Sequence, residues 1–422
     1  MLSQQEQSSN TKMLTEHALV IGAGMAGLVA ARVLTDQFAR VTIVDRDHLL
    51  DTPEFRQAAP QARHPHTLLR SGQMILERLF PGLSDELLAQ GAIPLDPHTD
   101  VVFFAGGDWR TPGQHDATMS IAASRPLLES TLYRRLVAHP RIQILPAHEV
   151  SHLTVDEART HVTGVRLYAR ARCDSTWMGA DVVLDTSGRQ SHAPQWLADL
   201  GYTPPEESTI DAFSGYATRI YRRPRTLDAS WRAMYIRPTP PAYARGGMII
   251  PMEGDRWHVA LIGEDGDYPP IDEAGFLNFA RNLPTPKLYE AIRDAEPLTR
   301  PIGYRITANR MRHYERLPRY LEGFLVLGDA VYSLNPIYAQ GITAAALSSI
   351  ALEGCLDAHH VSGVTGLAEG FQKHLSDALA QLWRHTTRRD GRWLSTQITY
   401  CIDINRCDTQ PISRVQIPEW LA

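Results

Sequence analysis

The stretch that decides the fold reads His17-Ala-Leu-Val-Ile-Gly-Ala-Gly-Met-Ala-Gly-Leu28 and continues, one helical length later, to Val41-Thr-Ile-Val-Asp45. An apolar run enters Gly22-x-Gly24-x-x-Gly27, and a second apolar run ends in an acid 18 residues after Gly27. In such a unit the glycines permit a tight turn, close approach of a ligand and close helix packing. The helix start attracts phosphate, and the acid can bond ribose hydroxyls. The stretch therefore predicts a dinucleotide-binding βαβ unit.

The flanks of the glycines carry this prediction, because glycine pairs alone are common in ordinary turns. Residues 18–21 before the glycines are wholly apolar, and residues 25–34 after them suit a helix. A dinucleotide-binding unit requires both features, whereas a simple turn requires neither. We therefore expect an α/β protein with a doubly wound, Rossmann-like parallel sheet.

Length, composition and charge restrict the class of protein. The 422 residues exceed one average domain, and a hydrophobic content of 43% is ample for a large core. The net charge of −5, without any block of five or more like charges, gives no global reason to expect a nucleic-acid partner. Only three of the 42 basic residues are lysines, at positions 12, 287 and 373. A mechanism that needs a lysine therefore has very few candidates.

The cysteines and the apolar segments predict a cytoplasmic protein without a metal site or a membrane span. Cys173, Cys355, Cys401 and Cys407 form no Cys-x-x-Cys pair and no metal-ligand spacing with histidine, which is typical of reduced, unpaired thiols. The first 16 residues lack the apolar core of a secretory signal. No run of 18 apolar residues occurs in the sequence.

A second informative stretch reads Gly328-Asp329-Ala-Val-Tyr-Ser-Leu-Asn335-Pro336-Ile-Tyr-Ala-Gln340-Gly341-Ile342. It follows an apolar run at 323–327, so it places an acid at a strand end and a glycine where a helix begins. Asp329 can accept hydrogen bonds from a polyol chain. The N–H groups of Gly341 and Ile342 lie at a positive helix end, which suits negative charge on the pyrimidine side of a reduced flavin.

Together the two stretches resemble the class A FAD-dependent monooxygenases, the family of aromatic hydroxylases and epoxidases. The resemblance extends from residue 17 to residue 360, and the family's motifs occur in the right order, including Arg125 in Ser-Arg-Pro-Leu-Leu-Glu and the segment Asp185-Thr-Ser-Gly188. Within the family the chain is most similar to the bacterial branch that includes polyether epoxidases. Arg63-His64-Pro-His66 and Asn335-Pro336-x-x-x-Gln340-Gly341 also have counterparts in that branch.

The resemblance implies a set of FAD contacts along the chain. It assigns Gly22, Gly24, Met25, Ala26 and Gly27 to the pyrophosphate, Asp45 and Arg46 to the adenosine ribose, Arg63 and Arg125 to the length of the FAD, Gly328 and Asp329 to the ribityl or pyrophosphate, and Pro336, Gly341 and Ile342 to the isoalloxazine end. His64 and His66 are candidate proton donors or orienting groups, because an imidazole titrates near neutral pH.

One position departs from the family pattern. The middle fingerprint of the family usually ends in Asp-Gly, and the matching pair here is Ser187-Gly188. The family's acid at this position is linked to both FAD and nicotinamide binding. FAD binding is still expected, but direct reduction by NADPH or NADH is left open beside electron delivery by a separate flavin reductase.

The resemblance also implies a reaction. In this family reduced flavin reacts with O2 to form a hydroperoxide, which the protein shields from water and presents to the substrate without a metal. We expect epoxidation or hydroxylation of an apolar, polyketide-like natural product. The residues that we assign to the apolar wall of its pocket are Tyr216, Met234, Met248 and Ile250.

Three other readings share parts of this pattern. A flavin halogenase depends on a lysine well after the glycine motif and on Trp-x-Trp-x-x-Pro, and neither occurs here. A reductase or dehydrogenase similar to the prenyl reductases would neither consume O2 nor oxygenate its product. A non-redox cyclase or scaffold would keep the dinucleotide without using it. Yellow protein that bleaches with dithionite and reoxidises in air would favour redox chemistry, and colourless protein would favour the scaffold.

The order of segments predicts an interrupted FAD-binding domain. We expect its first part at 17–205, an inserted and mainly antiparallel substrate domain at 206–300, its return segment at 301–360 and a helical region at 361–422.

Overall fold

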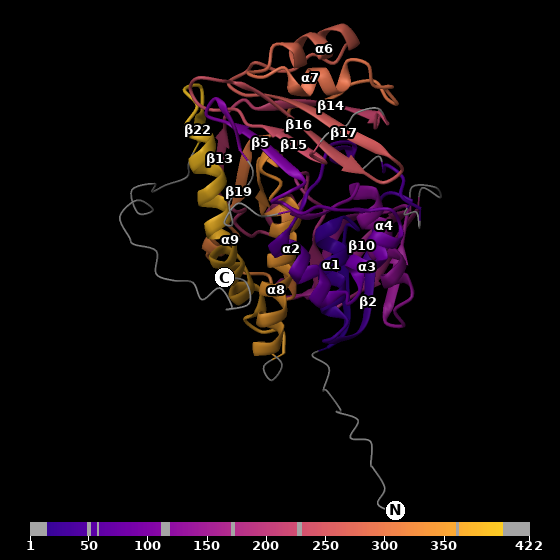
Figure 1. Cartoon of the computed structure of the whole chain (residues 1–422). Coiled ribbons are helices and arrows are strands. Elements are labelled where there is room, and N and C mark those ends of the chain that lie inside the picture. Colours follow the sequence, from indigo (N-terminus) through magenta and orange to yellow (C-terminus); the bar gives the residue numbers. More distant parts are fainter. Residues whose placement is uncertain are drawn as a thin grey trace, which may run out of the picture.

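The molecule has two layered parts, one built on a parallel sheet and one on a large mixed sheet, which lie at opposite ends of the view in Figure 1. The computed structural model describes residues 15–48, 52–56, 59–110, 119–169, 174–225, 230–359 and 363–399. The expected fold class, a Rossmann-like parallel sheet with additional antiparallel sheets and C-terminal helices, is confirmed.

The parallel sheet has the opening motif at its centre. Its strands follow the order β20 (Phe324–Val326), β12 (Val182–Asp185), β1 (Thr15–Ile21), β2 (Phe38–Val44) and β8 (Ile142–Leu145), and all of them are parallel. α1 (Met25–Leu34) joins β1 to β2, as the glycine motif predicts. The carboxyl ends of β1, β12 and β20 therefore meet at one edge, where open α/β sheets bind their ligands.

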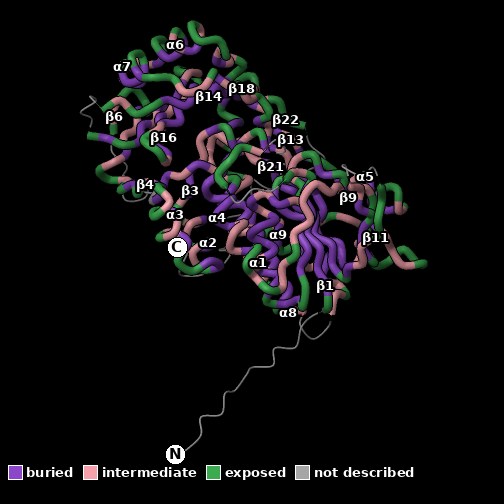
Figure 2. Tube along the Cα trace, turned by 90° about the vertical axis from the view of Figure 1, so that its right-hand side faces the viewer, coloured by how far each residue is buried: buried purple, intermediate pink, exposed green. Residues whose placement is uncertain are grey.

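Helices and a small antiparallel sheet enclose this parallel sheet. α4 (Arg125–Val137) contacts α1, and α8 (Gly341–His359) contacts α1, α2 (Arg70–Leu79) and α9 (Leu367–Asp390). The antiparallel sheet consists of β9 (His148–Val155), β10 (Val162–Ala169) and β11 (Asp174–Gly179), and its inward side chains join the same core. Figure 2 shows the strands around β1 as buried and the outer elements such as β11 as largely exposed.

A seven-stranded sheet forms the other part. Its order is β18 (Ile302–Tyr304), β14 (Gly215–Arg222), β17 (Arg256–Gly263), β16 (Arg245–Met252), β15 (Ala233–Ile236), β5 (Val101–Ala105) and β6 (Asp108–Arg110), antiparallel except between β15 and β5. The sheet thus extends beyond the segment 206–300, because β5, β6 and β18 come from the flanking segments. α6 (Glu273–Arg281) and α7 (Lys287–Ile292) cover its outer face (Figure 1).

Two smaller sheets and several short helices complete the described fold. One sheet has the order β21 (Tyr332–Ser333), β19 (Asn309–Arg312), β13 (Glu207–Asp211) and β22 (Gln397–Thr399), and the other has β3 (Leu68–Leu69), β7 (Met119–Ala122) and β4 (Ile93–Pro94). The short helices are α3 (Leu83–Ala89), α5 (Ala193–Asp199), η1 (Pro60–Arg63), η2 (Tyr314–Arg316), η3 (Gly328–Ala330) and η4 (Pro336–Tyr338).

Two of the sequence expectations concern α8 and the cysteines. Within the described ranges α8 is the one helix with the length and apolar composition of a membrane span, and 61% of its most apolar window is buried inside the protein. Its contacts with α1, α2 and α9 make it a core helix. Cys355 is a buried free thiol on this helix, whereas Cys173, Cys401 and Cys407 lie outside the described residues.

Candidate functional site

The glycine loop between β1 and α1 is tight on its protein side and open on the other. Gly22 has a φ of +99°, a conformation that L side chains rarely adopt. A Cβ on Gly27 would lie 1.8 Å from the Gly22 carbonyl oxygen, so only glycine allows this contact of helix with turn. For a Cβ on Gly24, the nearest atom beyond the adjacent residues would be Arg125 Nη2 at 3.9 Å. The loop therefore offers its backbone to a ligand at Gly24.

Asp45, at the end of β2, ties the glycine loop to the sheet. Its Oδ2 accepts the Ala23 N–H at 2.6 Å, and its Oδ1 accepts the Asp47 N–H at 2.8 Å. Burial raises the pKa of this carboxyl, and the Arg56 guanidinium and the two N–H groups oppose that shift. The side chain is 7% exposed, whereas the neighbouring Arg46 is exposed. Asp45 thus positions the loop in addition to the ribose contact that the resemblance implies.

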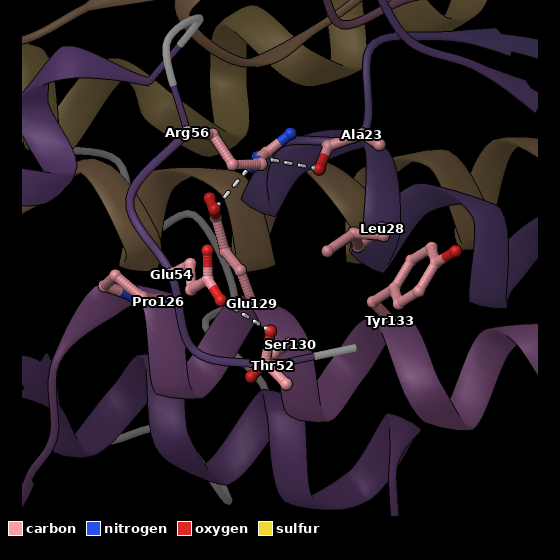
Figure 3. Close-up of a pocket in the computed structure, with 9 residues that line it drawn as sticks. All are labelled: Ala23, Leu28, Thr52, Glu54, Arg56, Pro126, Glu129, Ser130 and Tyr133. Atoms are coloured by element: carbon pink, nitrogen blue, oxygen red, sulfur yellow. Dashed lines mark hydrogen bonds and ion pairs between the residues drawn. The ribbon is translucent and has the colours of Figure 1, made fainter. Parts of the chain in front are cut away.

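A chain of buried and half-buried charges lies beside the glycine loop, and Figure 3 shows two of its members, Arg56 and Glu129. Arg56 Nη2 donates to the Ala23 carbonyl oxygen at 3.1 Å and to Glu129 Oε2 at 2.9 Å, and Arg125 Nε donates to Glu129 Oε1 at 2.8 Å. Burial alone would raise the pKa of Glu129, but the two guanidinium groups hold it below its usual value. Arg56 and Glu129 were not predicted from the sequence. It offers an arginine in the loop after Asp45 and an acid one helical turn after Arg125, but neither differs in pattern from a solvated charge.

The second motif meets the first one in space. Gly328 follows β20 with a φ of +69°, and a Cβ there would lie 2.7 Å from the Ala26 Cβ in the first turn of α1. Met25, which precedes Ala26, is buried beneath the same turn. The two glycine-bearing strand ends, far apart in the sequence, therefore lie against each other.

Asp329 faces this junction with a carboxyl that makes no hydrogen bond within the described residues. The residue is exposed to solvent, yet desolvation by the surrounding protein raises the pKa of the carboxyl. The guanidinium groups of Arg125, Arg189 and Arg310 oppose the shift. Asp329 is therefore an accessible hydrogen-bond acceptor in positive surroundings.

The start of α8 is open in the same way. Gly341 is exposed, and a Cβ there would meet nothing within 4 Å. The first N–H groups of a helix have no partners within it, so those of Gly341 and Ile342 are available to a ligand. Ile342 is buried and lines a pocket together with His66 and Arg125. Pro336, at the start of η4, is half-buried in the turn that leads into α8.

The middle fingerprint supports the glycine loop although it lacks the family's acid. Asp185, at the end of β12, accepts the Ser187 N–H at 2.8 Å and the Ser191 hydroxyl at 2.5 Å. The Thr186 hydroxyl lies 2.8 Å from the Ile21 carbonyl oxygen and 2.9 Å from that of Gly22, and donates to them. Ser187 itself is exposed at the edge of the sheet.

The loop Arg63–His66 enters the space between the two parts of the molecule. His64 is 2% exposed, and its Nδ1 is hydrogen-bonded to the Thr218 hydroxyl on β14 at 2.9 Å. His66 lies 3.4 Å from Arg125 Nη1, and its Nδ1 bonds the His64 carbonyl oxygen at 2.9 Å. Desolvation lowers the pKa of His64 to about 4 and that of His66 to about 3, so both are neutral near pH 7. Arg63 is exposed over the Phe55 ring.

The seven-stranded sheet turns one face toward this loop. Strand pairing places Met248 opposite Tyr235 and Ile250 opposite His258, and Tyr216 opposite Tyr304 of β18. Opposed side chains share a face, and alternation along a strand keeps Tyr216 and Thr218 together. The Tyr216 ring packs edge-on against His64, with 4.7 Å between centroids. Tyr216, Met248 and Ile250 therefore belong to one inner wall.

Met234 does not belong to that wall. It lies opposite Ile249, one residue away from the pair of Tyr235 and Met248, so it points to the other face of the sheet. It is fully buried there in the core under α6 and α7. Tyr235 occupies the inner position instead, stacked on Phe103 with 5.0 Å between ring centroids. The correction follows from the two-residue period of a strand, which hydrophobicity alone did not reveal because both faces are apolar.

These features together define a flavoprotein-type dinucleotide site. The glycine loop leaves room for a pyrophosphate at Gly24, Asp329 offers a free acceptor for a polyol, and the start of α8 offers unpaired N–H groups. All three lie along the carboxyl-end edge of one parallel sheet, with Arg125 close to the first two. The residues present therefore fit FAD.

Known proteins agree with this geometry. Residues 20–67 match the family model of the NAD(P)-binding Rossmann-like domain. Protein Rv3254 of Mycobacterium tuberculosis is 30% identical over 375 residues, covering 87% of this chain and 78% of the relative. The 6-methylpretetramide 4-monooxygenase of Streptomyces rimosus is 25% identical over 389 residues, covering 88% and 81%.

Two solved structures share the fold over most of both chains. The flavin-dependent brominase Bmp2 has a TM-score of 0.67 at 15% identity, over 90% of this chain and 88% of its own. The p-nitrophenol 4-monooxygenase PnpA of Pseudomonas putida has a TM-score of 0.64 at 18% identity, over 93% and 92%. At these identities the likeness concerns the fold.

The chain belongs to the family of FAD-dependent monooxygenases. It is thus an enzyme of the oxidoreductase class.

Proposed function

We propose that this enzyme uses FAD and O2 to hydroxylate or epoxidise an apolar, polyketide-like substrate. The observation that carries the proposal is the inner wall of the seven-stranded sheet, whose apolar members Met248 and Ile250 share one face with Tyr216 and Tyr235. Tyr304, which pairs with Tyr216, lies close enough to Asp329 and Arg125 for their charges to influence its pKa. The wall therefore begins beside the proposed cofactor position.

The name of one relative supports the substrate class. The Streptomyces rimosus relative is a 6-methylpretetramide 4-monooxygenase, and it aligns with 88% of this chain. The aromatic pair Phe103 and Tyr235, with an angle of 17° between the rings, offers a flat apolar surface to a substrate of extended, ring-containing shape. The Thr67 and Tyr235 hydroxyls, 3.2 Å apart, add one polar point to this surface.

Different residues would contact different parts of the cofactor. The loop Gly22–Gly27 and the start of α1 would receive the pyrophosphate, Arg125 would balance its charge, and Asp329 would accept hydrogen bonds from the ribityl chain. The N–H groups of Gly341 and Ile342 would favour negative charge at the flavin end. When bound, reduced FAD supplies the activation of O2 and the transfer of one oxygen atom.

His64 and His66 would hold their loop in place beside Arg125 and exclude water from the space between Arg125 and β14. Both imidazoles are neutral near pH 7, because desolvation lowers the pKa of His64 to about 4 and of His66 to about 3. Neutral rings fill the space between Arg125 and β14 without adding charge, and His64 fastens the loop to Thr218 on the inner wall. A role as general acid at neutral pH does not fit these pKa values.

The electron donor is either NADPH or NADH acting directly, or a separate flavin reductase. Ser187 stands where the family's acid for nicotinamide binding is expected. This favours a separate reductase.

The test begins with the colour and identity of the bound cofactor. Purified protein should be yellow, release FAD identified by mass spectrometry, bleach with dithionite and recover its colour in air. NADPH and NADH oxidation is then measured with and without an added flavin reductase. With a polycyclic aromatic polyketide as the probe and 18O2 as the gas, the product should carry one heavy oxygen atom. Protein that binds no FAD, or a product without label, would overturn the proposal.

A further inference from the structure

A buried polar network lies at the C-terminal end of α9, where the sequence predicted only a helical region outside the site. Asp390 is fully buried. Its carboxylate accepts hydrogen bonds from Asn309 Nδ2 at 2.6 Å, from Asn335 Nδ2 at 3.1 Å and from the Tyr338 hydroxyl at 2.5 Å. Two of these three donors belong to the turn that leads into α8.

The same network fixes the backbone of that turn. Asn309 Oδ1 accepts the Asn335 N–H at 2.7 Å, and Asn335 Oδ1 accepts the Ile337 N–H at 3.2 Å. The Ala339 N–H donates to the Pro336 carbonyl oxygen at 2.9 Å. The turn is therefore held on both sides, by β19 through Asn309 and by α9 through Asp390.

The network also reaches the inner side of the seven-stranded sheet. Asn335 Nδ2 donates to the Ser214 hydroxyl oxygen at 3.2 Å, and the Ser214 hydroxyl bonds Glu264 at the end of β17. Burial raises the pKa of Glu264 to about 8, so this carboxyl is neutral near pH 7. Burial also raises the pKa of Asp390, and its three side-chain donors oppose that shift. The turn, α9 and the substrate-facing sheet are thus joined through one pair of side chains, Asn335 and Asp390.

Backbone conformation supports a role beyond packing. Ala339 in the turn has a φ of 55°, Phe213 beside Ser214 has 50°, and Asp265 beside Glu264 has 59°. Left-handed conformations cost energy for residues other than glycine, and they persist where surrounding contacts determine them. Each of these three residues directly adjoins the network or its turn. Such strain clusters at active sites, ligand clamps and switch regions. Three further non-glycine residues of the described chain with positive φ, Ala147, Arg159 and Asp255, lie outside the network.

We propose that Asp390 is a positioning residue of the flavin site, which holds the turn 335–340 and thereby places the N–H groups of Gly341 and Ile342 against the pyrimidine side of FAD. The placement of FAD rests on the proposed function, whereas the holding of the turn rests on the hydrogen bonds alone. Asp390 itself touches neither cofactor nor substrate in this account. It acts through Asn335 and Tyr338.

The experiment compares Asp390→Asn, Tyr338→Phe and a control, Gln372→Leu. In Asp390→Asn one acceptor oxygen becomes an NH2 group, which faces the donors that surround it. Tyr338→Phe removes a single hydrogen bond with little risk to folding. Gln372 is an equally buried polar residue of α9 that bonds the Val326 carbonyl oxygen at 3.0 Å, away from the turn. Amide hydrogen exchange of the peptide 335–341 is measured in protein without and with FAD, and the reduction potential of the bound flavin is measured by dye equilibration.

Asp390→Asn should speed exchange in 335–341 by roughly tenfold or more, because an acceptor of the hydrogen bonds from Asn335 and Tyr338 is lost. Tyr338→Phe should give a smaller change of the same sign, and Gln372→Leu none in this peptide. Misplaced N–H groups favour the anionic reduced flavin less, so the potential should fall. A tenfold loss in relative affinity for the reduced form lowers a two-electron potential by about 30 mV.

Unchanged exchange in 335–341 for both Asp390→Asn and Tyr338→Phe would overturn the proposal. If Asp390→Asn does not fold, Tyr338→Phe decides it. Faster exchange with an unchanged potential would overturn the flavin-positioning claim, because the turn would then move without consequence for the cofactor. Wild-type protein that takes up no FAD would instead overturn the proposed function, and exchange in the cofactor-free protein would still decide whether Asp390 holds the turn.

Discussion

The glycine loop allows cofactor binding to be separated from folding by two single-methyl substitutions. Gly24→Ala adds its methyl where the nearest atom beyond the adjacent residues is Arg125 Nη2, 3.9 Å away. Gly24 has a φ of −78° and a ψ of −178°, which alanine adopts readily. Gly27→Ala adds its methyl 1.8 Å from the Gly22 carbonyl oxygen and 2.6 Å from the Thr186 hydroxyl oxygen. The Gly24→Ala methyl occupies space on the side of the loop where the cofactor is proposed to bind, and the Gly27→Ala methyl occupies space on the side that packs against protein.

The expected magnitudes follow from these distances. Gly24→Ala should change the free energy of unfolding of the cofactor-free protein by about 1 kcal/mol or less, the usual cost of alanine at a helix N-cap. A methyl group between the loop and a tightly bound pyrophosphate should cost about 1–3 kcal/mol of binding, as overpacking does in a core. This corresponds to roughly 5- to 150-fold weaker FAD binding. Gly27→Ala should destabilise the protein by about 3 kcal/mol or more, because backbone must move.

Two measurements check these values. Denaturant unfolding of the cofactor-free proteins gives the stability, and quenching of flavin fluorescence on titration gives the dissociation constant of FAD. Gly24→Ala protein with wild-type stability and wild-type FAD affinity would refute the placement of the pyrophosphate. A stable Gly27→Ala protein would refute the packing argument for the loop.

Three further predictions test other parts of the site. Glu129→Gln should destabilise the protein by about 3 kcal/mol in denaturant unfolding, because Arg125 and Arg56 lose the buried carboxylate between them, although Arg56 keeps Asp45 at 3.6 Å. Glu86→Gln, at a half-buried carboxylate that pairs with Arg134 and Arg135, should cost about 1 kcal/mol or less. Burial raises the folded-state pKa of Glu264 from 4.5 to about 8, so folding takes up a proton at this residue between these values, and its contribution to stability should fall with rising pH by up to about 1.4 kcal/mol per pH unit. The lowered pKa values of His64 and His66 give a slope of the opposite sign below about pH 6.5, so the slope of Glu264 is taken from the difference between wild type and Glu264→Gln. Glu264→Gln should lack this slope in unfolding at pH 5 to 8, and an identical slope would contradict the assignment. Met248→Trp on the inner wall should raise the KM for substrate with FAD affinity unchanged, while Met234→Leu on the outer face should leave both unchanged, and equal effects on KM would argue against the wall.

The sequence predicted the parts of the fold that depend on local pattern. The glycine loop was predictable because Gly22 needs a left-handed turn and Gly27 a close contact, and both demands are visible as glycines with apolar flanks. The return of the chain to a buried strand before Gly328-Asp329 was predictable because the preceding run is apolar, whereas its pairing with β12 was not predicted. These signals are visible in the sequence because the residues that form each of them lie within a few positions of one another.

Features that depend on distant contacts were not predictable in the same way. The bridge from Arg56 to Arg125 through Glu129 joins a loop to a helix, and no local pattern distinguishes these residues from solvated charges. Met234 was assigned to the wrong face because its strand is apolar on both sides. Apolar and polar residues do not alternate along it, so the sequence does not show which side chains share a face. Asp390 gave no signal at all, since its partners come from β19 and from the turn before α8.

The residues around Ser187 indicate what its departure from the family pattern means for the protein. In this chain the support of the glycine loop falls to Thr186, which bonds the carbonyl oxygens of Ile21 and Gly22, while Asp185 fastens the turn after β12 through Ser187 N–H and Ser191. The Ser187 side chain takes part in the second task, because its hydroxyl is also hydrogen-bonded to Asp185. A serine at this position therefore still supports the turn beside the loop that would hold FAD. We therefore predict that binding of FAD and reduction by a nicotinamide are separable in this protein. A weak reaction with NADPH should accompany normal FAD affinity, and it should be relieved by a flavin reductase rather than by added FAD.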